Sequence, residues 1–262
     1  MNKSMVGIIG RGMVGDATER QLEGSPVVSK VVGYDKVLGF TDPFVLKGCD
    51  FIFVCVPSYV DDLSAVDDAV LNAASMSNRI VIRSTLPLGQ TKKYMEEYPA
   101  NRLCFMPEFF RERSRVDDAL HPDKLVFGVE GSDLRMGEET AALFRHLYSH
   151  VELITSTTAA EMIKLSINAY YTTRIVLANQ LFDIAKAHGV GWEEVRTGLY
   201  ADKRIDPSGF DILLDGFRGA GGKCLPKDLD MTISAASAAG IEVPMLEAVR
   251  DVNNALLGGE EY

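Results

Sequence analysis

The sequence predicts an α/β protein in which a doubly wound, mostly parallel sheet is followed by an all-helical domain with one long central helix. Three observations support this fold class. Short apolar runs rich in β-branched residues alternate with helical patterns up to residue 156. No glycine or proline interrupts residues 158–188. The chain of 262 residues exceeds one average domain and falls short of two full ones. We therefore predict domains at 1–156 and 157–262.

Most of the strand candidates are apolar throughout instead of alternating with polar residues. This composition is typical of parallel strands that are covered by helices on both faces. The runs occupy residues 5–10, 31–35, 50–57, 79–85, 102–108, 124–130 and 151–156.

The helical half begins with a capping-box pattern, Thr158 and Glu161, which opens a helix over 158–188. At 1.5 Å per residue this helix spans roughly 45 Å, so its apolar surface needs partners along its whole length. Further helices at 191–201 and 226–257, the latter with a break at 240–244, cover part of it. We expect a second copy of the chain to cover the rest, in a homodimer built around helix 158–188.

The composition excludes several classes of protein. Apolar residues make up 47% and charged residues 24%, as in soluble globular proteins, and the net charge of −10 disfavours nucleic acid as a partner. No run of about 18 apolar residues is present, so we expect a cytoplasmic protein without a membrane partner. The cysteines at 49, 55, 104 and 224 have no CxxC spacing, which predicts neither a disulfide framework nor a metal site.

A glycine pattern after the first strand indicates dinucleotide binding. The segment Gly10-Arg11-Gly12-Met13-Val14-Gly15 opens a helix, and Asp35 follows twenty residues later at the end of the second strand. The glycines allow the backbone to approach a pyrophosphate, and the acid can accept hydrogen bonds from both ribose hydroxyls. The first domain is therefore Rossmann-like. Because Asp35 repels a 2′-phosphate, we expect NAD as the cofactor.

A second glycine-rich loop delivers Cys224 directly before a helix whose first turn holds Asp228. The helix N-terminus and the flanking Lys223 and Lys227 favour the thiolate, which makes Cys224 a candidate nucleophile. A small residue in a crowded loop is an equally good interpretation of this cysteine alone.

Other polar residues have both a functional and a plain explanation. Lys164 and Asn168 are spaced i,i+4 and share one face of the long helix. In isolation, a solvent-facing lysine is the simpler interpretation. Ser84, Thr85 and Glu108 follow strands at the carboxyl edge, where ligands bind in such sheets, although each is also compatible with a helix cap.

Taken together, these residues resemble the UDP-glucose/GDP-mannose dehydrogenases, a family that oxidises the C6 alcohol of a sugar nucleotide to a carboxylate with two NAD. The resemblance extends over nearly the whole chain. Its motifs are the first glycine pattern, Cys55-Val56-Pro57-Ser58, residues 84–89, Pro107-Glu108-Phe109-Phe110-Arg111-Glu112, residues 122–124, residues 160–164 with Asn168, and Gly221 to Asp228.

The resemblance implies a role for each motif residue. The implied catalytic residues are Cys224 as nucleophile, Lys164 and Asn168 as stabilisers of charge on the substrate oxygen, Glu108 and Asp228 as acid/base groups, and Thr85 as the residue that positions water. The implied cofactor contacts are Gly10, Gly12, Met13, Val14, Gly15, Asp35, Val56, Pro57, Ser58, Ser84, Glu112 and Lys227. The implied substrate contacts are Phe109, Phe110, Arg111, Lys164, Asn168 and Gly221.

Several departures from the family pattern concern the substrate. Ala220 stands where the family usually has an aromatic residue, residues 204–219 form a longer segment than usual, and Ser58-Tyr59 replaces the usual Thr-Pro. The sequence ends at Tyr262, before the third domain that holds the nucleotide in the family. Two alternatives therefore stay open: a two-electron dehydrogenase of the 3-hydroxyacid type, and an NAD-binding subunit that needs a separate nucleotide-binding chain.

Overall fold

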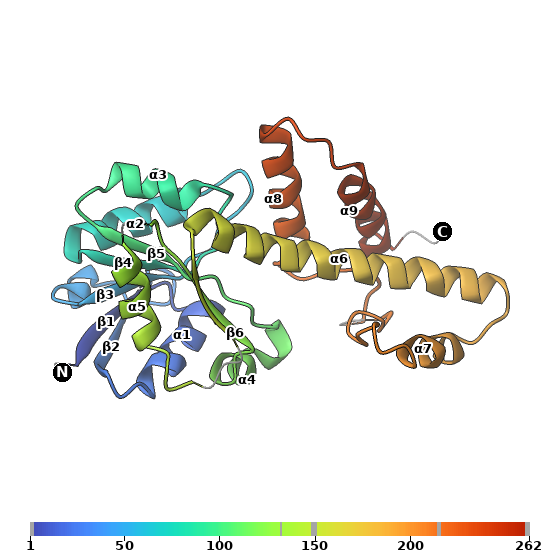
Figure 1. The fold of residues 1–262 in the computed structure, drawn as a ribbon, viewed down its shortest axis with the longest axis horizontal. Coiled ribbons are helices and arrows are strands. Elements are labelled where there is room, and N and C mark those ends of the chain that lie inside the picture. The colour runs from blue at the N-terminus through green and yellow to red at the C-terminus, as the bar shows by residue number, and fades with distance from the viewer. Residues whose placement is uncertain (1–2, 132, 148–150, 214–215, 260–262) are drawn as a thin grey trace. The chain divides into compact units, whose positions relative to one another are not determined.

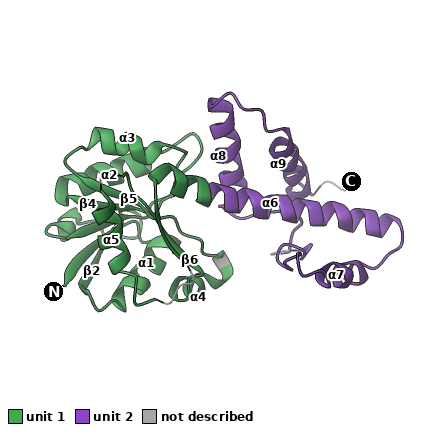
Figure 2. Ribbon diagram, viewed as in Figure 1, with its two compact units in different colours: residues 1–164 green, residues 165–262 purple. Residues whose placement is uncertain are grey.

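A computed structural model describes residues 3–131, 133–147, 151–213 and 216–259, apart from the side chain of Glu112 (Figure 1). The chain divides into two compact units, Met1–Lys164 and Leu165–Tyr262 (Figure 2). The division falls within helix α6 (Thr157–Ala187), so this helix contributes residues to both units.

Unit 1 is built on a seven-stranded sheet with the order β2-β1-β3-β4-β5-β6-β7. Neighbouring strands are parallel except β5 and β6, which pair antiparallel through Phe105 and Gly128. The predicted mostly parallel sheet is thus confirmed. The strands are β1 (Ser4–Ile9), β2 (Val28–Tyr34), β3 (Phe51–Val54), β4 (Arg79–Ile82), β5 (Arg102–Phe105), β6 (Lys124–Gly128) and β7 (Val151–Thr155).

Two hydrophobic cores, one on each face of the sheet, explain why most positions of the central strands are apolar. Ile52 and Val54 of β3 belong to the core under α2 and α3, whereas Phe51 and Phe53 belong to the core under α1 and α5. The helices and short 3-10 turns of unit 1 are α1 (Met13–Glu23), η1 (Pro43–Leu46), α2 (Ser64–Met76), α3 (Gln90–Glu97), η2 (Glu112–Ser114), α4 (Arg115–Leu120) and α5 (Leu134–Ala142).

The predicted long helix is present as α6, which is 31 residues long. It is followed by α7 (Trp192–Tyr200), α8 (Leu225–Ala238) and α9 (Pro244–Leu257), which begin within two residues of their predicted positions. Apolar side chains of α6, α8 and α9, including Val176, Ile233 and Leu256, form the core of unit 2. Among the described residues, no helix is long and apolar enough to cross a membrane.

The start of α6 corrects one prediction. The side chain that caps this helix is Ser156, whose Oγ accepts from the amide of Ala159 at 3.2 Å. Glu161 is not part of a capping box. Its carboxylate accepts hydrogen bonds from the amide of Gly89 at 2.5 Å and from the amide and hydroxyl of Thr91 at 2.9 and 2.6 Å. Glu161 therefore joins α6 to the N-terminus of α3, where a negative charge is favourable.

We predict that Glu161→Ala lowers the free energy of unfolding by roughly 2–4 kcal/mol, because the substitution leaves the amides of Gly89 and Thr91 without their acceptor. Urea unfolding monitored by circular dichroism measures this change. Glu96→Ala, an exposed site on α3, is the matched control and should change stability by less than about 0.5 kcal/mol. Equal losses in the two variants would contradict the assigned role of Glu161.

Candidate active site

The first glycine loop leaves room for a ligand at the N-terminus of α1. Gly10 has a φ of 88°, and a Cβ there would lie 2.8 Å from the carbonyl oxygen of Cys55. A Cβ on Gly15 would lie 1.9 Å from the carbonyl oxygen of Gly10. By contrast, a Cβ on Gly12 would meet no described atom within 4 Å, and no side chain caps the helix that begins at Met13. This arrangement fits the pyrophosphate of a dinucleotide.

Asp35, at the end of β2, is held in a fixed orientation beside this loop. Its carboxylate accepts from the amide of Arg11 at 2.6 Å and from the amides of Val37 and Leu38 at 2.8 and 3.0 Å. Burial by itself would raise the pKa of Asp35, but these backbone hydrogen bonds hold the pKa below its usual value. The side chain is therefore a fixed negative charge, which fits ribose hydroxyls and repels a 2′-phosphate.

The strand order reverses between β1 and β3, and ligands bind at such a switch point in open α/β sheets. Val56, Pro57 and Ser58 follow β3 at this edge. The hydroxyl of Ser84, which follows β4, donates to the carbonyl of Val56 at 2.7 Å. Thr85 is half-buried next to Ser84. The structure therefore joins two of the predicted cofactor segments at the carboxyl edge of the sheet.

A buried ion pair joins Glu108 to Lys164. The Nζ of Lys164 lies 2.9 Å from Oε1 of Glu108, and the two side chains are 5% and 9% exposed. The other carboxylate oxygen accepts from the amide of Phe110 at 2.9 Å. The ring of Phe109 lies under the ammonium groups of Lys124 and Lys164, at 4.5 and 5.9 Å. Lys164 is thus not the solvent-facing lysine that its isolated sequence position suggested.

Electrostatics keep Glu108 ionised despite its burial. Removal from water alone would raise its pKa. The charge and hydrogen bond of Lys164, the amide of Phe110 and the charge of Arg83 outweigh that effect and hold the pKa of Glu108 below its usual value. Glu108 is therefore a carboxylate with a fixed position, suited to accept a proton from a nearby group.

Unit 2 contains a second polar cluster at the start of α8. The Nδ2 of Asn168 donates to Oδ2 of Asp228 at 2.6 Å, and Nζ of Lys227 lies 2.7 Å from Oδ1 of the same carboxylate. Asp228 is fully buried. Cys224 is exposed and occupies the N-cap position of α8, one turn before Asp228. The structure thus brings Asn168, Lys227 and Asp228 together and leaves the thiol accessible.

The loop that carries Cys224 is held by a residue that sequence reasoning missed. Asn253 of α9 binds Ala220 on both sides, accepting from its amide at 2.7 Å and donating to its carbonyl at 2.9 Å. The ring of Phe217 packs so closely on Gly221 that a Cβ there would lie 2.2 Å from it. The available signal was a single amide on the inward face of a helix that is otherwise apolar there.

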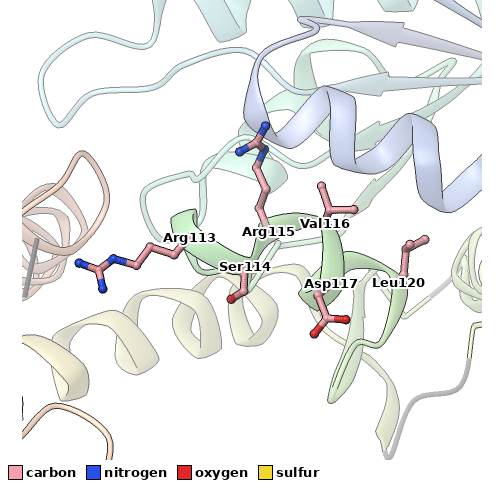
Figure 3. A pocket seen from close by; sticks show the side chains of 6 residues that line it. All are labelled: Arg113, Ser114, Arg115, Val116, Asp117 and Leu120. Carbon is pink, nitrogen blue, oxygen red and sulfur yellow. The ribbon is translucent and has the colours of Figure 1, made fainter.

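Two further predicted residues, Arg111 and Glu112, follow Phe110 directly. Arg111 forms a bidentate ion pair with Asp118, and the side chain of Glu112 lies outside the described residues. None of the predicted site residues lines the shallow pocket on η2 and α4. Figure 3 shows this pocket, which is lined by Arg113, Ser114, Arg115, Val116, Asp117 and Leu120. Among the described residues, no group of three or more His, Cys, Asp or Glu side chains could hold a metal ion.

Two family models match the chain. The NAD binding domain of the UDP-glucose/GDP-mannose dehydrogenase family matches residues 17–152, and the central domain of that family matches residues 158–255. Among curated relatives, UDP-glucose 6-dehydrogenase AglM of Haloferax volcanii is 31% identical, covering 84% of this chain and 56% of the relative. The putative UDP-glucose 6-dehydrogenase YtcA of Bacillus subtilis is 30% identical, covering 81% and 52%. The chain spans about half the length of these relatives.

Solved structures share the fold. A UDP-glucose dehydrogenase from Pyrobaculum islandicum matches with a TM-score of 0.83 and 23% identity, over 97% of this chain and 68% of that one. A 3-hydroxyisobutyrate dehydrogenase from Mycobacterium tuberculosis matches with a TM-score of 0.77 and 13% identity, over 96% of this chain and 93% of that one. The same arrangement of strands and helices therefore occurs in both kinds of dehydrogenase.

We predict that Glu108→Gln lowers the free energy of unfolding at pH 7 by roughly 3–5 kcal/mol, because it leaves the Lys164 charge buried without the carboxylate. The folded pKa of Glu108 lies below its unfolded value of about 4.3, so the carboxylate contributes fully above that pH. The contribution is lost as pH falls through the folded pKa. The difference between wild type and variant should therefore shrink in acid, as urea unfolding at a series of pH values would measure.

The double variant Glu108→Gln/Lys164→Met is the control for this experiment. It removes both charges, so it should be less destabilised than Glu108→Gln alone. A difference between wild type and Glu108→Gln that stays constant from pH 7 into the acid range would contradict the assigned ionisation of Glu108.

Proposed function

Because the chain belongs to the UDP-glucose/GDP-mannose dehydrogenase family, we propose that it oxidises the C6 alcohol of a nucleotide sugar to a carboxylate, in two hydride transfers to NAD. The observation that carries this proposal is the exposed Cys224 thiol at the N-terminus of α8, one turn before the buried Asp228. A helix N-terminus stabilises a thiolate, and an accessible thiolate is a nucleophile. Oxidation by two electrons only would not need this residue.

Most residues of the proposed cofactor site belong to unit 1. NAD, when bound, supplies the two-electron acceptor for each oxidation. We propose that the backbone from Gly10 to Gly15, including Gly12, Met13 and Val14, holds the pyrophosphate. Asp35 binds the ribose. Further contacts come from a set of residues at the carboxyl edge and beyond, namely Val56, Pro57, Ser58, Ser84, Glu112 and Lys227.

In the first oxidation, Lys164 assists transfer of the C6 hydroxyl proton to water, and Lys164 and Asn168 stabilise the negative charge that develops on the oxygen. The two residues lie one turn apart on α6. Phe109, Phe110, Arg111 and Gly221 are the proposed substrate contacts. Hydride loss from C6 gives an aldehyde, and the sulfur of Cys224 adds to its carbonyl carbon to form a thiohemiacetal.

The second oxidation converts the thiohemiacetal into a thioester on Cys224. Glu108 or Asp228 then takes a proton from a water that Thr85 positions, and the hydroxide attacks the thioester carbon. The carbon–sulfur bond breaks, the thiolate leaves and the carboxylate is released. Each substrate thus consumes one water and reduces two NAD. Both carboxylates are held by hydrogen bonds, as general bases require.

A two-electron dehydrogenase of the 3-hydroxyacid type is the second candidate. The observation in its favour is the likeness to the 3-hydroxyisobutyrate dehydrogenase, which extends over 93% of that chain. Such an enzyme would form one NADH per substrate and no thioester. A subunit that works with a separate nucleotide-binding chain is the remaining alternative, and it would be inactive alone.

We also propose that a second copy of the chain covers part of α6. Tyr170, Leu177 and Ile184 recur at seven-residue intervals, so they lie along one side of the helix, and they are 58%, 49% and 58% exposed. A stripe of large apolar side chains on a long helix suits a symmetric helix–helix interface.

For the catalytic proposal, we predict that purified protein forms two NADH per molecule of one UDP- or GDP-sugar from a panel, measured at 340 nm. Cys224→Ser should lower kcat by on the order of a thousandfold, because the alkoxide is harder to form than the thiolate. Ser234→Ala, an exposed site on α8, should leave kcat unchanged. Identical absence of NADH in wild type and Cys224→Ser would refute the proposal, and one NADH per substrate would support the second candidate.

For the assembly, we predict that Leu177→Glu converts a homodimer into monomers, because it places a charge in the middle of the apolar stripe. Sedimentation velocity measures the change. The control is Leu71→Glu on α2, where the leucine is similarly exposed at 55%. A wild-type protein that sediments as a monomer, or a Leu177→Glu variant that remains dimeric, would contradict this interface.

A further inference from the structure

Arg83 is a buried cation to which the proposed reaction gives no role. It follows β4 directly and is 2% exposed. Its Nη1 donates to Oγ1 of Thr18 at 3.0 Å and to Oε1 of Gln21 at 2.7 Å. Both partners are fully buried residues of α1, the helix that opens at the first glycine loop. The guanidinium therefore connects the dinucleotide-binding helix to the carboxyl end of the central strand.

The hydrogen-bond partners of Arg83 are neutral, which makes its burial costly. In the part of the chain that the structure describes, Arg83 forms no ion pair, and its Nε lacks a hydrogen-bond partner although it is buried. Removing a charge from water costs several kcal/mol unless nearby charges compensate. Burial lowers the pKa of Arg83, but arginine remains protonated in proteins. A permanent positive charge is therefore fixed at this position.

Glu108 is the carboxylate whose charge can compensate Arg83. The ring of Phe110, two residues after Glu108, lies 5.3 Å from the guanidinium. The carboxylate of Glu108 faces Lys164 from α6 and interacts electrostatically with Arg83 from the end of β4. Cys55, after β3, is the third titratable group nearby, and burial raises its pKa to about 11, so it is neutral at pH 7. Glu108 is thus paired with Lys164, and the segment that carries it also contacts Arg83 through the ring of Phe110.

We propose that Arg83 is a positioning residue whose permanent charge keeps Glu108 ionised when Lys164 is neutral. Lys164 is a titratable partner, and Glu108 loses its paired charge once Lys164 is neutral. A buried carboxylate without a cation would take up a proton and could no longer serve as a base. Arg83 prevents this because it does not titrate. Only this catalytic consequence rests on the proposed function; the electrostatic relation between Arg83 and Glu108 does not.

The test measures the pKa of Glu108 directly. The side-chain carboxyl carbons of glutamate are labelled with ¹³C, their NMR shifts are followed against pH, and Glu108→Gln assigns the signal. Lys164→Met mimics the loss of the lysine charge. In Lys164→Met/Arg83→Met, the pKa of Glu108 should be higher than in Lys164→Met by about 1–3, the usual effect of one nearby cation. An equal pKa in these two variants overturns the proposal.

A second pair of variants keeps Arg83 in place, in case its replacement prevents folding. Gln21→Glu adds a carboxylate where the amide oxygen lies 2.7 Å from Nη1, so it neutralises the arginine with little change in shape. It should raise the pKa of Glu108. Gln21→Leu removes the same hydrogen bond without adding a charge, and should leave that pKa unchanged. Equal values in Gln21→Glu and Gln21→Leu also overturn the proposal.

These outcomes do not depend on turnover. A protein that reduces no NAD but shows the expected pKa changes would contradict the proposed function and leave the role of Arg83 intact. If the enzyme is active, its rate should fall at low pH as Glu108 becomes protonated. This fall should occur at the same pH in Arg83→Lys and at a higher pH in Arg83→Met. If Glu108→Gln abolishes activity but Arg83→Met does not change the pH at which the rate falls, the proposal is contradicted.

Discussion

The buried ion pair between Glu108 and Lys164 is the interaction on which the candidate site depends. Burial of two opposite charges is favourable only when their geometry is well defined. The pair therefore fixes the first turns of α6 against the segment after β5. One turn earlier, Glu161 binds the start of α3 through three hydrogen bonds. Hydrogen bonds and an ion pair thus position the first turns of α6 and Lys164. Apolar packing stabilises the rest of the helix.

The fold was largely predictable because it follows from composition over short windows. A strand buried on both faces is apolar at nearly every position, and this composition marks most of the seven runs, all of which form strands of one sheet. The start of α6 was not predictable in the same way. The pattern Thr158–Glu161 suits a capping box, but the donors that Glu161 uses lie about 70 residues away in the chain. The local sequence pattern carries no information about hydrogen-bond partners that are distant in the chain.

The same difference between local and long-range contacts explains which parts of the site could be predicted. Spacing placed Lys164 and Asn168 on one face of a helix and Cys224 at the start of another, because these relations are local. Whether Lys164 faces solvent or a buried carboxylate depends on Glu108, which is 56 residues away. Arg83 and Asn253 bind backbone and side-chain groups that are remote in sequence, so their neighbours in the chain do not identify these partners.

The proposed covalent mechanism accounts for which candidate residues are buried and which are exposed. Groups that exchange protons need a fixed position, and the two proposed bases, Glu108 and Asp228, are buried and held by several partners. A nucleophile must instead be accessible to the substrate, and Cys224 is exposed at a helix terminus. Asn253 and Phe217 contact the loop that carries it. A cysteine kept only for packing would be buried, as Cys55 and Cys104 are, where burial raises the pKa of the thiol to about 11 and about 12. The contrast among cysteines of one chain therefore favours a chemical role for Cys224.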